Sequence, residues 1–126
     1  MHFNTKVPIY LQILDQIKYK ILRKEYRAGS MTPSVRALAA EYNVTNSTIQ
    51  RVMFELVRDR LLIPARGVGY YVTDDKNLIN RLKEDAYKEK LSEFFQELRS
   101  LGISKSELIT IIKPYSDQWD DLHGRD

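Results

Sequence analysis

A short run of hydrogen-bonding side chains, within the segment VTNSTIQRV at residues 44–52, is the part of the sequence best suited to recognition chemistry. Three small polar residues, Asn46, Ser47 and Thr48, precede Gln50 and Arg51. Small side chains permit close approach to a partner, and a glutamine amide carries the donor and acceptor pair that matches an adenine edge. Arginine adds attraction to anions. These side chains are suited to hydrogen bonding with a polar, anionic surface.

The apolar residues of the same segment predict a helix over residues 45–59 rather than a strand. The apolar stripe consists of Ile49, Val52, Met53 and Leu56. Its spacings of three, one and three fit one face of a helix and lack the alternation of a strand. Thr45 is a suitable N-cap, because its hydroxyl can accept from a free backbone N–H. The face opposite the stripe carries Ser47, Arg51, Phe54 and Arg58, with Asn46 and Gln50 at its N-terminal edge.

Two helices are predicted ahead of this one. An amphipathic helix over residues 8–24 begins at a proline, and its apolar row consists of Ile9, Ile13, Ile17 and Ile21. After a glycine-containing loop, Thr32 and Pro33 predict the cap and the first residue of a second, short helix. The inward face of that helix would consist of Val35, Leu38, Ala39 and Tyr42. This leaves Ser34 and Arg36 near the exposed N-terminal end.

A β-hairpin is predicted over residues 61–72, LLIPARGVGYYV, where two β-rich runs flank a loop with two glycines and one arginine. Two short helices joined by a tight turn and followed by a basic hairpin make a winged helix-turn-helix. The major groove of duplex DNA admits one helix, whose N-terminal side chains reach base edges. Arg66 at the hairpin tip suits a narrow minor groove, and Gly67 and Gly69 let the backbone pass close to phosphate.

The C-terminal part is predicted to form two helices. The longer one covers residues 77–101, and a shorter one begins near Ser104 and is broken by Pro114. The longer helix carries a coiled-coil-like seam of Tyr87, Leu91, Phe94, Leu98 and Leu101. An appendage of this size is too small to bury such a seam alone, so pairing with a second copy of the chain is expected.

Composition narrows the classes of function. The net charge is +3, and residues 1–75 hold 11 Lys and Arg against 7 Asp and Glu, whereas residues 76–126 hold 9 against 10. A basic N-terminal part is compatible with a polyanionic partner. There is no cysteine, and the only histidines, His2 and His123, lie far apart, so no metal, other cofactor or enzymatic activity is expected. No apolar run reaches the length of a membrane span and no signal peptide is indicated, which predicts a cytoplasmic protein.

In its N-terminal part the sequence resembles the GntR family of bacterial transcription regulators. The matching segments are PIYLQILDQIKYKIL, TPSVRALAAEYNVTNSTIQRVMFEL and LLIPARGVGYYV, which cover most of residues 6–73. The resemblance implies that Arg36, residues 46–50 and Gly67 meet DNA. Residues 77–115 resemble the two-helix dimerisation unit of the smallest branch, the YtrA-like subfamily, whereas larger branches carry an effector-binding domain. Genes for membrane transporters are the targets that this resemblance suggests.

The sequence departs from the family pattern at three positions. Arg60 stands where glycine is usual in the turn before the wing, and a positive φ would cost an arginine about 1 kcal/mol there, so a different turn is an alternative. Thr32 stands where an apolar residue is usual. Phe54 replaces a polar residue and either packs on a neighbouring element or lies exposed beside DNA.

We therefore expect a mainly α fold with a small β-hairpin. A winged helix-turn-helix DNA-binding domain would occupy residues 1–75, and a helical dimerisation domain residues 76–126. The expected function is sequence-specific regulation of transcription, as a repressor that binds a two-fold symmetric operator in double-stranded DNA as a homodimer. The predicted DNA-binding residues are Ser34, Arg36, Thr45, Asn46, Ser47, Thr48, Gln50, Arg51, Arg66, Gly67 and Gly69.

Alternatives stay open at two levels. Arg36 could pair with Glu41 rather than contact DNA, and the polar residues 46–48 could serve only to cap their helix. For the whole protein, one alternative is an adaptor that binds other proteins through a winged-helix scaffold. Another is a ligand-gated form of the same regulator, with an unknown small-molecule effector.

Overall fold

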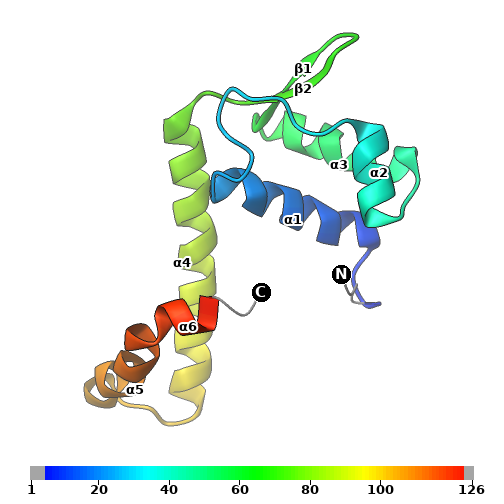
Figure 1. Cartoon of the computed structure of the whole chain (residues 1–126). Coiled ribbons are helices and arrows are strands. Elements are labelled where there is room, and N and C mark those ends of the chain that lie inside the picture. The colour runs from blue at the N-terminus through cyan, green and yellow to red at the C-terminus, as the bar shows by residue number, and fades with distance from the viewer. Residues whose placement is uncertain (1–4, 124–126) are drawn as a thin grey trace. The chain divides into compact units, whose positions relative to one another are not determined.

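The computed structural model describes residues 5–123 and shows a mainly helical chain with one β-hairpin (Figure 1), which confirms the predicted fold class. The elements are α1 (Ile9–Leu22), α2 (Val35–Tyr42), α3 (Asn46–Arg58), β1 (Leu62–Ala65), β2 (Gly69–Val72), α4 (Lys76–Ser100), α5 (Lys105–Asp117) and α6 (Trp119–His123). His2 lies outside the described residues. Within that range, no helix has the length and apolar character needed to cross a membrane.

The chain consists of two compact units, Met1–Asp85 and Ala86–Asp126, and α4 runs from the first into the second. The first turns of α4 therefore belong to the unit that holds α1, α2, α3 and the hairpin. The domain boundary predicted after residue 75 stays a prediction.

The core of the first unit is made by the apolar stripes of the first three helices. Its fully buried side chains include Ile13, Ile17 and Ile21 of α1, Leu38 of α2, and Ile49, Val52, Met53 and Leu56 of α3. Both α1 and α2 pack against α3, as Figure 1 shows. Because the buried stripe of α3 faces these two helices, its opposite face remains in solvent.

A half-buried lysine joins the end of α1 to α2. The ammonium group of Lys20 lies 5.4 Å from the ring centre of Tyr26 and 5.7 Å from that of Tyr42, and it pairs with Glu41 at 3.4 Å. Burial lowers the pKa of Lys20, but Tyr42, Tyr26 and Glu41 together raise it by more, so this pKa lies above its usual value. The contact fixes α2 on α1 and engages the carboxylate of Glu41.

The start of α2 differs from the prediction. Its N-cap is Ser34, whose hydroxyl accepts from the backbone N–H of Ala37 at 3.0 Å, and not Thr32. Thr32 is buried, and its backbone N–H donates to the carbonyl of Tyr70 at 3.0 Å. Since the hairpin holds Thr32 in this way, the chain reaches its helical conformation only after Pro33, and Ser34 caps it.

The wing is a two-stranded antiparallel hairpin whose register runs from Leu62↔Val72 to Ala65↔Gly69. The segment before α2 also pairs with it, through a bridge between Met31 and Tyr71 and a 2.8 Å bond from the N–H of Val72 to the carbonyl of Ser30. The sequence pattern did not predict that the segment before α2 pairs with the hairpin. This pairing attaches the wing to the body of the first unit.

The turn after α3 keeps its usual form although it contains an arginine. Arg60 has a φ of 67°, and the N–H of Leu61 donates to the carbonyl of Leu56 at 3.0 Å, while that of Arg60 donates to Val57, also at 3.0 Å. These two bonds define a Schellman motif, in which glycine normally takes the left-handed position. The alternative turn considered from the sequence does not form.

Replacement of this arginine by glycine is expected to stabilise the protein. Arg60→Gly removes the steric cost of a positive φ, so the free energy of unfolding should rise by up to about 1 kcal/mol. Urea denaturation followed by circular dichroism measures the change. Arg60→Ala is the matched control, because it also removes the guanidinium but retains the left-handed penalty. Equal stability of the two variants would contradict the explanation.

In the second unit α5 begins at a capping box. The Ser104 hydroxyl accepts from the backbone N–H of Glu107 at 3.2 Å, and the Glu107 carboxylate accepts from the Ser104 hydroxyl and backbone N–H. These two bonds lower the pKa of the Glu107 carboxyl. The prediction that Pro114 breaks this helix is wrong. Its carbonyl still accepts from the N–H of Gln118 at 3.2 Å, so the helix continues past the proline to Asp117.

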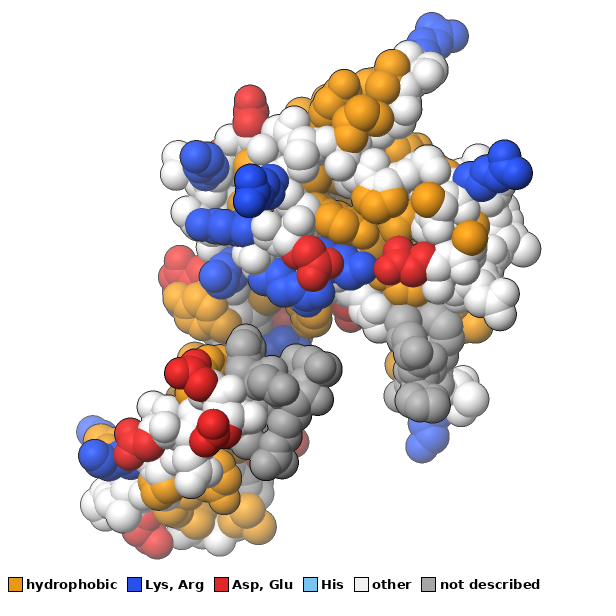
Figure 2. Space-filling view, in the orientation of Figure 1, with side chains coloured by type: hydrophobic (Ala, Val, Ile, Leu, Met, Phe, Trp, Pro, Cys, Tyr) orange, Lys and Arg blue, Asp and Glu red, His pale blue; other side chains and the backbone are white. Residues whose placement is uncertain are grey.

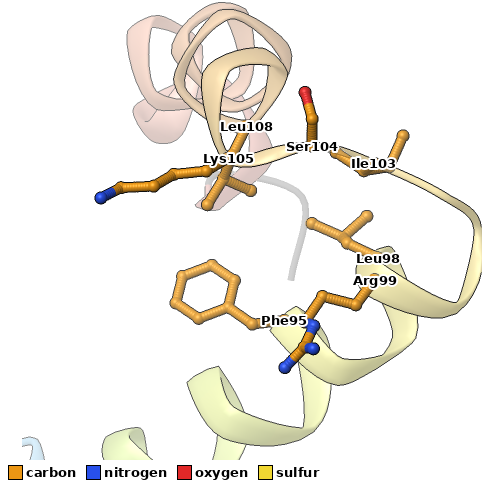
Figure 3. Close-up of a pocket in the computed structure, with 7 residues that line it drawn as sticks. All are labelled: Phe95, Leu98, Arg99, Ile103, Ser104, Lys105 and Leu108. Carbon is orange, nitrogen blue, oxygen red and sulfur yellow. The ribbon is translucent and has the colours of Figure 1, made fainter.

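The second unit leaves its apolar side chains incompletely covered. None of the described side chains at residues 86–121 is buried. A cavity of about 290 Å³ remains between the end of α4 and the start of α5, and Figure 3 shows Phe95, Leu98 and Leu108 around it. Two helices of this size therefore do not close a core by themselves.

Candidate nucleic-acid interface

A network of hydroxyl groups caps the N-terminus of α3. The Thr45 hydroxyl accepts from the backbone N–H of Thr48 at 3.3 Å and lies 3.0 Å from the hydroxyls of both Ser47 and Thr48. The capping role that the sequence left open is therefore real for these residues. Ser47 remains exposed, whereas Thr48 is half-buried, so Ser47 has the greater freedom to meet a partner.

The outward face of α3 presents three longer polar side chains, those of Asn46, Gln50 and Arg51, which are all exposed. Their orientation follows from the stripe that the core buries on the other side of the helix. The donors and acceptors of this face point to solvent within the first two turns, the part of a recognition helix that reaches base edges.

Arg51 is held by a residue of α1 that the sequence did not single out. Its guanidinium carbon lies 3.6 Å from the ring centre of Tyr10, in cation–π stacking geometry. Stacking restricts a flexible side chain and lowers the entropy that a later contact must overcome. Tyr10 follows from no pattern in the sequence, because the contact depends on how α1 packs against α3.

The N-terminus of α2 carries the next pair of predicted residues. Ser34 uses its hydroxyl as the cap, and Arg36 is exposed in the first turn. The carboxylate of Glu41, proposed from the sequence as an alternative partner for Arg36, binds Lys20 instead. A helix N-terminus with an exposed arginine favours an anion such as phosphate.

The wing places Arg66 and Gly67 at its exposed tip, where Figure 2 shows a basic side chain. The turn is closed by a 2.8 Å bond from the N–H of Val68 to the carbonyl of Ala65, and Gly67 has a φ of 75° that suits glycine. Gly69 is half-buried, and a Cβ added there would lie 3.1 Å from the Met31 side chain. Close packing against Met31 thus accounts for a glycine at residue 69, and no contact with DNA is needed to explain it.

The predicted DNA-binding residues all belong to the first unit and come from α2, α3 and the hairpin. Their contact with DNA stays a prediction, as does the dimerisation seam, which lies on α4 except for Leu101. Of the seam residues, Tyr87, Leu91, Phe94 and Leu101 are exposed, and Leu98 borders the cavity between α4 and α5. Phe54, whose role the sequence left open, is 63% exposed.

Comparison with known proteins agrees with this arrangement. Residues 9–72 match the family described as bacterial regulatory proteins, gntR family. The chain is 36% identical to the transcriptional regulator YhcF of Bacillus subtilis, over 91% of this chain and 95% of YhcF. It is 29% identical to the transcriptional repressor YtrA of the same organism, over 90% of this chain and 88% of YtrA.

A solved structure gives the same result for the fold. A GntR family transcriptional regulator from Listeria monocytogenes superposes with a TM-score of 0.84 at 38% sequence identity, covering 89% of this chain and 98% of that protein. The relatives are described as regulators of transcription. The chain belongs to the GntR family, and the protein is a DNA-binding transcription regulator whose relatives include YtrA and YhcF.

Proposed function

We propose that the protein is a repressor that binds a two-fold symmetric operator as a homodimer. The observation that carries the proposal is the outward face of α3, where Asn46, Gln50 and Arg51 are exposed at the start of a helix whose other side is fully buried. The similarity to the repressor YtrA, which extends over 88% of that protein, supports the direction of regulation.

In this proposal α3 lies along the major groove, with its N-terminal residues closest to the base edges. Gln50 offers a paired donor and acceptor to adenine, and Asn46 and Ser47 approach the same strand. Arg51, held on the Tyr10 ring, supplies charge beside the groove. These roles separate base reading, which the amides perform, from attraction to phosphate, which needs only charge.

Two further elements position the first unit on the duplex. The α2 N-terminus, with Arg36 exposed, binds backbone phosphate. The wing extends Arg66 towards a minor groove, whose narrow form attracts a guanidinium group, and Gly67 lets the backbone approach. In this proposal the protein catalyses no reaction. Its target, a bacterial operator, would place the protein in the cytoplasm.

The second unit supports the pairing of two copies. Its described side chains include no buried residue, and large apolar groups such as Phe94 and Leu91 are each 44% exposed. A second copy would cover this surface by an isologous contact, the commonest form of dimer. Two α3 helices would then read half-sites about one helical turn apart.

Selection of bound sites from a random pool of duplexes tests the proposal. The expected result is a two-fold symmetric motif whose half-sites are separated by about 10 base pairs or a multiple of that distance. Fluorescence anisotropy on the selected site then gives the affinity and stoichiometry. Recovery of no preferred sequence, or of a motif without symmetry bound by one chain, would contradict the proposal.

Arg36→Ala is expected to weaken binding to the selected operator and to random duplex by the same factor. If Arg36 neutralises one phosphate, the slope of log affinity against log salt should become shallower by about one. Lys113→Ala is the control, since it removes a cation that is exposed in the second unit. An unchanged salt slope for Arg36→Ala would exclude a phosphate contact.

A further inference from the structure

A large aromatic side chain lies in the middle of the outward face of α3. Ser47, Arg51, Phe54 and Arg58 follow one another at spacings of four, three and four, which forms a single row on a helix. The four buried residues of α3 lie on the other side. Phe54 is therefore exposed because of its position in the helix, and 63% of its surface meets solvent.

The ring contacts found in the structure do not account for this phenylalanine. Its ring joins no aromatic pair or cation–π contact found among residues 5–123. A phenylalanine exposed to water forgoes the burial that makes it one of the usual core residues. A partner that covers the ring would recover this free energy.

The neighbours of Phe54 indicate the chemistry of that partner. Arg51 and Arg58 flank the ring in its row, and Ser47 and Gln50 lie one to two turns towards the N-terminus. A protein-docking surface usually has a continuous apolar centre, whereas this row of α3 has one ring among polar and charged groups, and its Arg58 pairs with Glu55. Such a face matches duplex DNA, whose major groove exposes one apolar group, the 5-methyl of thymine.

We propose that Phe54 is a specificity-determining residue whose ring contacts the 5-methyl group of a thymine in the operator. The inference rests on the proposed operator binding and adds to it the base and the atom that Phe54 contacts. In each half-site Gln50 would read one base by hydrogen bonding, and Phe54 would select thymine at another position, towards the C-terminal end of α3.

Deletion of single methyl groups from the DNA tests the proposal. Each thymine of the selected operator is replaced in turn by deoxyuridine, which differs only in the methyl, and affinity is measured by fluorescence anisotropy. At one position per half-site the wild-type protein should lose about fourfold, the factor that corresponds to one buried methyl group. Replacement in both half-sites should then cost a dimer about sixteenfold.

Phe54→Ala should bind the thymine operator more weakly and lose its response to deoxyuridine at that one position. Phe54→Leu, which keeps an apolar side chain, should retain part of the response. Gln50→Ala is the matched control on the same helix, and it should keep the full response. Thermal denaturation should show each Phe54 variant folded with an unchanged or higher Tm, because the ring is exposed and both replacements form helices well.

Three results would overturn the assignment. Equal weakening of Phe54→Ala on thymine and deoxyuridine operators would place the ring on sugar or phosphate. An unchanged affinity for both would mean that another partner covers it. Full retention of the deoxyuridine response would assign the methyl contact to another residue. The proposed function fails separately, when the wild-type protein prefers no duplex sequence at all.

Discussion

Phe94→Glu is expected to yield a folded monomer that binds the operator at least about 100-fold more weakly than the wild-type protein, since the second half-site no longer binds intramolecularly. Phe94 lies in the middle of the seam on α4 and is 44% exposed in the single chain. A glutamate there would place two like charges near the two-fold axis of the proposed dimer and would need to lose its hydration.

Analytical ultracentrifugation reports the association state, and anisotropy on full and half operators reports affinity. The mutant should bind the half operator as well as the wild-type protein does, because α3 and the wing are unchanged. Gln96→Glu is the matched control, since it adds the same charge to the exposed surface of α4 outside the seam. A wild-type protein that is monomeric, or a Phe94→Glu variant that still dimerises, would contradict the proposed interface.

The core of the first unit could be predicted from the sequence because each helix buries a regular apolar stripe. The stripe of α3, for example, fixes both the helix and its outward face, so the exposure of Gln50 and Arg51 follows from residue spacing. The hairpin was equally evident, since β-rich runs flank a glycine-containing turn.

Features that depend on contacts between elements could not be predicted in this way. Thr32 and Ser34 are both suitable caps by residue type, and a hydrogen bond from Thr32 to Tyr70 in the wing excludes Thr32. The stacking of Arg51 on Tyr10 likewise needs the packing of α1 on α3. Local patterns carry no information about either contact.

Pro114 shows a different limit of prediction from the sequence. A proline inside a helix removes one donor, and from sequence this predicts a break. In the structure α5 continues to Asp117. The proline is near the end of the helix, so only a short segment depends on the bonds beyond it.

Gln50→Ala is expected to weaken binding to the selected operator by about 1 to 3 kcal/mol, while binding to random duplex changes little. The side chain is exposed in the second turn of α3, so its removal leaves the core and the cap of the helix intact. The loss should be greatest for the operator base that Gln50 reads. Substitution of that base in the DNA should produce no further loss in the mutant.

Competition binding with operators changed at one base pair measures this coupling. Gln96→Ala makes the same chemical change on the exposed surface of α4 and should leave every affinity unaltered. If Gln50→Ala weakens operator and random duplex equally, Gln50 contacts the backbone, and sequence preference must arise from other residues of α3. If only the operator is affected and the base substitution adds nothing, the amide reads that base, because a contact already removed cannot be lost twice.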